Sequence, residues 1–157
     1  MSLYLEQSLK IARLLTEFAP PETIHVYSVD EAWICVDGME RRLGNRWQIA
    51  QKIKDSIWER FGLPACIGIG PNKFLAKVIL DIEAKETGIA ECRYEDVPVK
   101  LWPQPVQKIW GIGRRMKVRL NQMGILTAGH LAHYPLEQLK KRFGVMGEQL
   151  YWHAWGV

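Results

Sequence analysis

Two adjacent carboxylates, Asp30 and Glu31, lie between two short apolar segments of the chain. Neighbouring carboxylates repel each other, and such pairs usually lie where water or a cation relieves the repulsion. Because divalent metal ions take hard oxygen ligands, a pair of acids at the tip of a hairpin is a candidate metal site. Aspartate is also a favoured turn residue. On spacing alone, therefore, a merely solvated turn remains the alternative.

A second segment, residues 68–77, reads Gly-Ile-Gly-Pro-Asn-Lys-Phe-Leu-Ala-Lys. Its glycines lead from an apolar stretch into the amino end of a predicted helix, where backbone amides and the helix dipole favour an anion. Lys73 and Lys77 are four residues apart and share one face of that helix, from which both can reach a phosphate. The segment is not a Walker loop, so an ordinary helix start with surface lysines is the alternative.

A third segment combines glycine with positive charge. Gly111, Ile112 and Gly113 form a Gly-x-Gly sequence between two predicted helices, which is typical of a helix-hairpin-helix element. Its glycines let backbone amides approach a DNA phosphate with no side chain in the way. The basic residues that follow are Arg114, Arg115, Lys117 and Arg119. A helical turn capped by glycines is the alternative.

Charge is unevenly distributed along the chain. Residues 1–97 contain 12 Lys/Arg and 15 Asp/Glu, for a net charge of −3, whereas residues 98–157 contain 9 Lys/Arg and 2 Asp/Glu, for a net charge of +7. A basic segment of this kind favours a polyanionic partner, and nucleic acid is the commonest one. A basic face that only keeps the protein soluble is the alternative.

Composition excludes some classes of protein. The chain has 157 residues, of which 48% are hydrophobic and 24% charged, so it is expected to fold around a real core. Its apolar runs are far shorter than the roughly 18 residues of a membrane span. Cys35, Cys66 and Cys92 have no metal-ligand spacing and lie in apolar stretches. We expect buried, reduced thiols and a cytoplasmic protein.

The elements that must position these residues follow from periodicity and from turn residues. An α+β fold is expected, with an antiparallel sheet covered by helices on one face. The order resembles a ferredoxin-like unit that lacks its first strand, because the chain opens on a helix. Asp30 and Glu31 are the only residues between two strands, which predicts a tight hairpin. The expected helices are residues 4–18, 47–61 and 73–84, and the expected strands are residues 24–29, 32–36, 65–69 and 89–94.

Beyond this region the pattern is entirely helical. Pro98, Pro103 and Pro105 mark a linker, so we place a domain boundary between residues 97 and 98. The second domain, residues 98–157, is expected to be a small all-α unit that contains the helix-hairpin-helix element. Its short helices are expected around residue 106 and at residues 114–123, 128–132, 136–143 and 148–155.

The three segments together, in this order and spacing, resemble the Y-family (translesion) DNA polymerases. They are most similar to the UmuC-like bacterial branch, which acts in the repair of UV damage. The matching sequences begin at Tyr27 (Tyr-Ser-Val-Asp-Glu-Ala-Trp), at Gly68, and at Ile109 (Ile-Trp-Gly-Ile-Gly-Arg-Arg-Met-Lys-Val-Arg-Leu). The resemblance runs from Tyr4 to the end of the chain. It implies that residues 1–97 are part of a catalytic palm and residues 98–157 a thumb.

The resemblance also implies roles for the residues singled out above. Asp30 and Glu31 correspond to metal-binding catalytic acids of the palm, with Mg²⁺ as the cofactor of a two-metal nucleotidyl transfer. Glu31 would position the primer 3′-hydroxyl, and Asp30 would bridge metal and triphosphate. Lys77, and less directly Lys73, correspond to contacts with the deoxynucleoside triphosphate. Residues 111–115 would bind primer-template DNA. A sliding clamp is a further expected partner, through a C-terminal part that this sequence lacks.

The sequence departs from the family pattern at both ends. In the family, a first metal-binding aspartate lies on an opening strand followed by the fingers, and a little-finger domain follows the thumb. We expect this chain to lack both, and therefore to be inactive by itself although it comes from a DNA-repair polymerase. Two other functions remain open: a non-catalytic DNA-binding fragment, and a nucleotide cyclase, whose palm-like fold also carries acids on a hairpin. The basic Gly-x-Gly segment argues against a cyclase, which has no use for duplex DNA.

Overall fold

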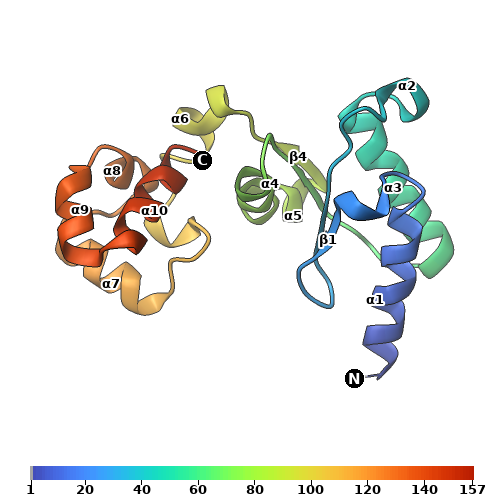
Figure 1. Ribbon diagram of the computed structural model, residues 1–157, viewed down its shortest axis with the longest axis horizontal. Coiled ribbons are helices and arrows are strands. Elements are labelled where there is room, and N and C mark those ends of the chain that lie inside the picture. The colour runs from blue at the N-terminus through green and yellow to red at the C-terminus, as the bar shows by residue number, and fades with distance from the viewer. Residues whose placement is uncertain (1) are drawn as a thin grey trace. The chain divides into compact units, whose positions relative to one another are not determined.

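A computed structural model describes residues 2–157 (Figure 1). The chain forms two compact units, one up to Ile67 and one from Gly68 onward. This division does not coincide with the boundary expected between residues 97 and 98. The boundary expected between a palm and a thumb, at residues 97 and 98, stays a prediction.

The first unit consists of helices and one β-hairpin. Helix α3 begins at a capping box, in which Asn45 and Gln48 each accept a hydrogen bond from the other's backbone amide, and it ends at Gly62 in the left-handed conformation. The buried core is made of Leu14, Leu15, Phe18, Ile49, Ile53 and Ile57. The elements are α1 (Ser2–Leu15), a 3₁₀ turn (Pro21–Thr23), β1 (Ile24–Val26), β2 (Ala32–Ile34), α2 (Glu40–Leu43) and α3 (Arg46–Phe61).

Helix α1 confirms the predicted first helix but not its buried face. Leu15 is buried, as the helical spacing of apolar residues predicts, and so is the adjacent Leu14. Leu5 and Leu9, which the same spacing predicts to be buried, are 54% and 55% exposed. Burial in α1 is therefore confined to its C-terminal half.

The second unit opens with the segment that carries the candidate lysines. The expected helix from residue 73 is present but continues to Thr87, through one stretch of π-helix. The four expected strands are also present, but they are only three residues long and pair two by two, β1 with β2 and β3 with β4, instead of forming a single sheet. These elements are β3 (Ile67–Ile69), α4 (Lys73–Ile79), a π-helical stretch (Leu80–Ala84), α5 (Lys85–Thr87) and β4 (Ile89–Glu91).

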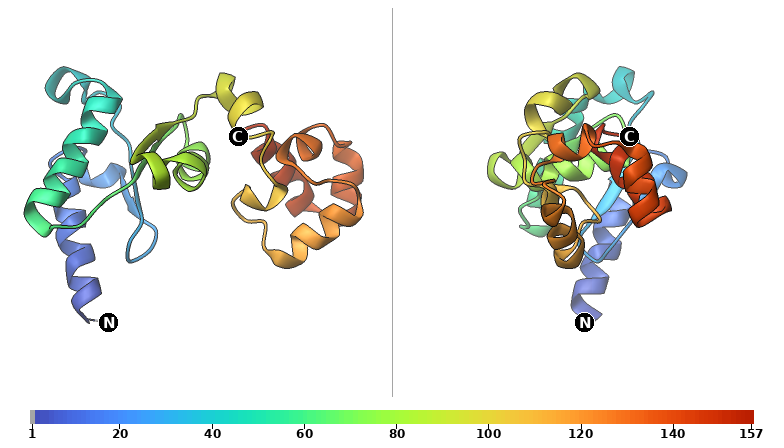
Figure 2. Two further views of the ribbon diagram at one scale, coloured as in Figure 1. Left: turned by 180° about the vertical axis from the view of Figure 1, so that it is seen from behind. Right: turned by 90° about the vertical axis from the view of Figure 1, so that its left-hand side faces the viewer.

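The rest of the second unit is helical, as expected, and α8 and α9 have the predicted bounds (Figure 2). The expected linker contains a short helix, α6, because Val97 and Leu101 are buried in the core instead of facing solvent. The elements are a 3₁₀ turn (Tyr94–Asp96), α6 (Val97–Lys100), a second 3₁₀ turn (Val106–Lys108), α7 (Arg114–Gln122), α8 (Ala128–Ala132), α9 (Leu136–Phe143) and α10 (Val145–Ala154).

The expectation of three buried thiols is correct for one of them. Cys92 is buried, but Cys35 and Cys66 are exposed. Both lie just outside a three-residue strand, where the chain no longer alternates between core and solvent. Across residues 2–157, no helix is both long and apolar enough to cross a bilayer.

Candidate nucleotide and nucleic-acid sites

The hairpin that carries the two acids is wider than the sequence predicted. Strands β1 and β2 are antiparallel, and Val26 pairs with Ala32 at the end of the ladder. The loop is therefore residues 27–31, not Asp30 and Glu31 alone. Within it, the backbone amides of Tyr27 and Ser28 both donate to the Glu31 carbonyl oxygen, at 2.9 and 3.2 Å. These bonds place Asp30 in the turn and Glu31 at its base.

The two carboxylates lie in different surroundings. Asp30 is exposed, and its Oδ1 accepts a hydrogen bond of 2.8 Å from the Ser28 hydroxyl. Glu31 is half-buried. Below the loop, the rings of Tyr27 and Trp33 pack edge to face with centroids 5.0 Å apart. This aromatic contact across the hairpin holds the base of the loop in place.

A cavity of about 190 Å³ adjoins the hairpin within the first unit. Its walls are mainly apolar side chains of α1, α3 and the two strands, among them Ile11, Val26 and Ile53. The charged residues of its lining are Asp30 and Glu31. The acids thus lie where an apolar hollow meets solvent.

Two carboxylates alone make at most part of a divalent-cation site. Asp30 and Glu31 are neighbours on one loop, and their oxygens are the hard ligands that Mg²⁺ prefers. No group of three or more His, Cys, Asp or Glu side chains in the described part of the chain is arranged to hold a metal ion. The two acids therefore fit a metal whose other ligands come from bound phosphates, water or additional protein groups.

The helix of the candidate lysines is fixed at its amino end by Asn72. The Asn72 Oδ1 accepts a hydrogen bond of 2.8 Å from the amide of Leu75. One first-turn amide is thus already bonded, which weakens the expectation of an anion held by free amides at this helix start. The Asn72 Nδ2 donates to the Gly156 carbonyl and to the Tyr94 hydroxyl, at 2.8 and 3.1 Å.

The lysines themselves differ in exposure and in contacts. Lys73 is exposed, whereas only 11% of the Lys77 side chain is accessible. The Lys77 Nζ lies 3.3 Å from Asp81 Oδ2, and the Lys85 Nζ lies 2.7 Å from Asp81 Oδ1. Burial raises the pKa of Asp81, but the hydrogen bond from Lys85 and the charge of Lys77 outweigh it and lower that pKa below its usual value.

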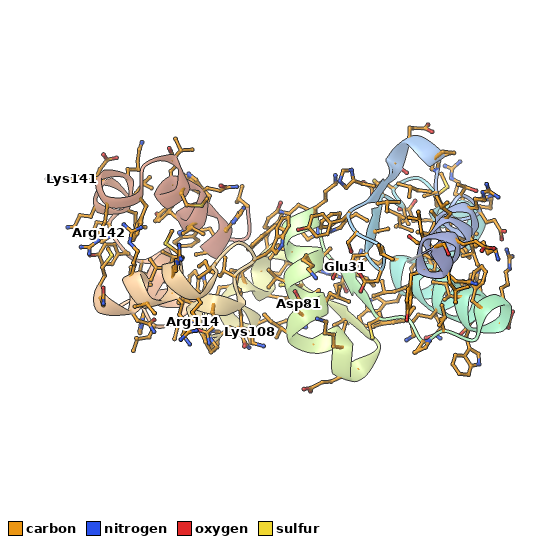
Figure 3. The ribbon with its side chains drawn as sticks, turned by 90° about the horizontal axis from the view of Figure 1, so that it is seen from below. Glu31, Asp81, Lys108, Arg114, Lys141 and Arg142 are labelled. Atoms are coloured by element: carbon orange, nitrogen blue, oxygen red, sulfur yellow. The ribbon has the colours of Figure 1, made fainter. Side chains whose placement is uncertain are left out.

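Asp81 was not among the residues predicted to belong to this site. Its signal was available, because Lys77, Asp81 and Lys85 are spaced by four residues and so share one helix face. Figure 3 labels Asp81 on the helical segment that follows Lys77.

The Gly-x-Gly segment has an open backbone. Gly111 has a φ of +96°, in the left-handed region that favours glycine, and a Cβ placed on Gly111 or on Gly113 would meet nothing within 4 Å. Ile112 between them is buried and anchors the segment to the core. Gly113 precedes α7 without a side-chain cap, and Arg114 and Arg115 are exposed at the start of that helix. The two glycines thus present accessible backbone beside two cations.

A second basic group lies at the end of α9, where Lys140, Lys141 and Arg142 are all exposed (Figure 3). The Lys140 Nζ lies 3.6 Å from Glu148. The next residue of α9 is Phe143. The guanidinium of Arg119, from α7, lies over its ring, 4.7 Å from the ring centroid. Lys140, Lys141 and Arg142 contribute to the charge of +7 but belong to none of the three segments singled out in the sequence.

Comparison with known proteins identifies the family. Residues 1–81 match the impB/mucB/samB family, and residues 107–157 match the thumb domain of DNA polymerase iota. The chain belongs to the impB/mucB/samB family. This is the Y-family of DNA polymerases that the three segments indicated, so that reading of the sequence is confirmed.

Similar proteins carry names from DNA repair and DNA synthesis. The chain is 46% identical to the UvrX protein of Bacillus subtilis, over all of this chain and 37% of that protein. It is 41% identical to DNA polymerase IV of Moorella thermoacetica, over 99% of this chain and 38% of that protein. The chain therefore spans less than half the length of these family members.

Solved structures agree with the fold. The crystal structure of DinB from Sulfolobus solfataricus is 30% identical in sequence and superimposes with a TM-score of 0.82, over 99% of this chain and 45% of that one. An insertion ternary complex of Dbh DNA polymerase gives a TM-score of 0.83 at 31% identity, again over 99% of this chain and 45% of that one. The mixed α/β fold followed by a helical unit is thus a Y-family fold, which confirms the predicted fold class.

Proposed function

We propose that the chain is the palm and thumb part of a DNA-directed DNA polymerase that copies damaged templates. The observation that carries this proposal is the β1–β2 hairpin, which displays Asp30 and Glu31 in a chain that aligns over almost its whole length with DNA polymerase IV. Residues 1–97 act as the palm and residues 98–157 as the thumb. The substrates are primer-template DNA and a deoxynucleoside triphosphate.

Asp30 and Glu31 are the proposed catalytic residues and the proposed ligands of Mg²⁺. When bound, such an ion stabilises negative charge on the transferred phosphoryl group and activates the attacking hydroxyl. The Ser28 hydroxyl orients one oxygen of Asp30, which leaves the other oxygen free to bind a cation. Glu31, at the rigid base of the loop, orients the primer end, and Asp30 in the turn faces the triphosphate.

Lys77 and Lys73 are proposed to bind the triphosphate. Lysine is a compact cation with three N–H donors, which suits phosphate oxygens. On the thumb, the open backbone of Gly111 and Gly113 contacts DNA phosphates, and the arginines that follow add charge. Contacts of this kind position the duplex without reading its sequence.

A non-catalytic role in DNA binding is the second candidate, because the basic segment of the thumb serves it without the palm. Substitution of the hairpin acids separates the two candidates. In the polymerase that contains this segment, Asp30→Ala and Glu31→Ala should abolish primer extension and leave duplex binding nearly unchanged. Asp37→Asn removes an exposed acid of the same unit outside the hairpin and serves as the control. Extension at the wild-type rate by Asp30→Ala or Glu31→Ala would contradict the proposed catalytic role.

A further inference from the structure

The helical segment after Asn72 carries three charged residues, spaced by four, along one face. Lys77 and Lys85 both contact the carboxylate of Asp81, which lies midway between them. The backbone at this point is π-helical, from Leu80 to Ala84. Such turns are rare and occur often at functional sites, and Asp81 lies within this one.

The Lys77 side chain reaches toward the carboxyl end of its helix. Cα–Cβ bonds tilt toward the amino end of a helix, so a long side chain normally covers the turn before its own residue. For Lys77 that turn is the one that begins with Lys73, the other proposed triphosphate contact. The Lys77 Nζ instead lies 3.3 Å from Asp81, one turn toward the carboxyl end. The contact with Asp81 thus lies on the opposite side of Lys77 from Lys73 along the helix.

The negative charge of Asp81 is balanced by a second lysine besides Lys77. Its shorter contact is to Lys85, at 2.7 Å, and that side chain is 61% exposed and free to follow the carboxylate. If Lys77 turned toward a bound phosphate, Asp81 would keep one partner, so the exchange leaves no buried charge unpaired. Asp81 thus keeps a cationic partner when Lys77 binds a phosphate.

We infer that Asp81 is a positioning residue that competes with the nucleotide for Lys77 and so weakens triphosphate binding. The inference rests on the proposed role of Lys77. Two effects act in the same direction: the carboxylate must give up one of its lysines, and its own charge repels the polyphosphate. Asp81 sets the affinity of the site, and Lys85 acts as the counterion that remains when Lys77 has moved.

The test measures binding of Mg²⁺–dATP and of inorganic tripolyphosphate to the purified chain by calorimetry at low salt. Asp81→Asn should bind both ligands more tightly than wild type, by about three- to five-fold. Glu86→Gln is the matched control, because it removes an exposed acid from the same helical segment. It should change the affinity little. Equal gains in both variants would mean a general charge effect and would overturn the inference, as would weaker binding by Asp81→Asn.

A double variant separates this inference from the proposed function. Lys77→Gln should weaken binding. Asp81→Asn added to it should not raise the affinity, because the lysine for which Asp81 and the nucleotide compete is gone. If Lys77→Gln binds both ligands like wild type, the proposed role of Lys77 is wrong. If Lys77→Gln weakens binding but Asp81→Asn changes nothing, only the competition is wrong. Thermal unfolding of each variant checks that the helix remains folded.

Discussion

Asn72 and Gly156 are 84 residues apart in the sequence, and the Asn72 side-chain amide donates a hydrogen bond of 2.8 Å to the Gly156 carbonyl. The same side chain caps α4 through Leu75. Close by, the Phe74 ring stacks on His153 with centroids 4.3 Å apart. One asparagine thus joins the start of the lysine-bearing helix to the end of α10, within the second unit.

The first prediction concerns this double role of Asn72. Asn72→Ala removes the cap and the side-chain bonds to Gly156 and Tyr94, and should lower the free energy of unfolding by about 2–3 kcal/mol. Thr127→Ala removes a cap alone, since the Thr127 hydroxyl accepts from the amide of His130 and caps α8. It should cost about 1 kcal/mol. Urea unfolding of the purified chain measures both values, and equal losses would show that the bonds donated by the Asn72 side-chain amide add nothing.

The second prediction concerns the close packing of α9 and α10. A Cβ on Gly147 would lie 2.2 Å from the Leu139 carbonyl oxygen, too close for any side chain. Gly147→Ala should therefore destabilise the chain by about 2–4 kcal/mol, because two helix backbones must separate. Gly113→Ala places the same methyl group in open space at a φ of −79°, and should change stability by less than about 0.5 kcal/mol. Similar melting temperatures for the two variants would contradict the packing.

The third prediction concerns Cys92 and alkaline pH. Burial raises the pKa of the Cys92 thiol to about 11, from an ordinary value of 9.0. Between these values the unfolded chain loses its thiol proton and the folded chain keeps it, so stability should fall as pH rises from about 9 to 11. The loss attributable to this thiol is about 2 kcal/mol.

Substitution identifies the group responsible. Unfolding of Cys92→Ala, measured between these pH values, should show a smaller slope than wild type, whereas Cys35→Ala, which changes an exposed thiol, should keep it. In a thiol-labelling experiment at neutral pH, Cys35 and Cys66 should react quickly and Cys92 slowly. An unchanged pH slope in Cys92→Ala would assign the alkaline loss of stability to other groups.

Local patterns in the sequence predicted the helices well. Gly62 marks the end of α3, whose predicted start at residue 47 is one residue late, and the bounds of α8 and α9 follow from spacing and turn residues alone. The register in which two strands pair was harder to predict from the sequence. The loop of residues 27–31 is set by the register of Val26 against Ala32, which depends on how both strands pack and not on turn residues.

The candidate site was predictable as a set of residues but not as a set of contacts. Adjacent acids and lysines of matching spacing marked the segments as candidates, and their roles stay predictions. The spacing of four residues puts Lys77 and Asp81 on one helix face, but it does not predict the π-helical stretch from Leu80 to Ala84 in which Asp81 lies. Likewise, nothing local predicts that the amide of Asn72 reaches Gly156, because the partner comes from the far end of the chain.

The last prediction concerns DNA binding by the helical unit. The chain should bind duplex DNA weakly and without sequence preference, because backbone amides and cations contact phosphates and not bases. If about three or four phosphates are neutralised, the slope of log affinity against log salt should be near −3. Titration of labelled duplex at several salt concentrations measures that slope.

Two pairs of variants then locate the interface. Arg114→Ala with Arg115→Ala should flatten the slope by about one to two units, since these cations flank the open glycines. Lys141→Ala with Arg142→Ala removes the same charge at the end of α9 and should flatten it less. Gly113→Val changes no charge and adds a side chain in open space. It should fold like wild type but bind more weakly, because the branched side chain keeps the phosphate away from the backbone. Full affinity in Gly113→Val would show that DNA does not approach the chain at this hairpin.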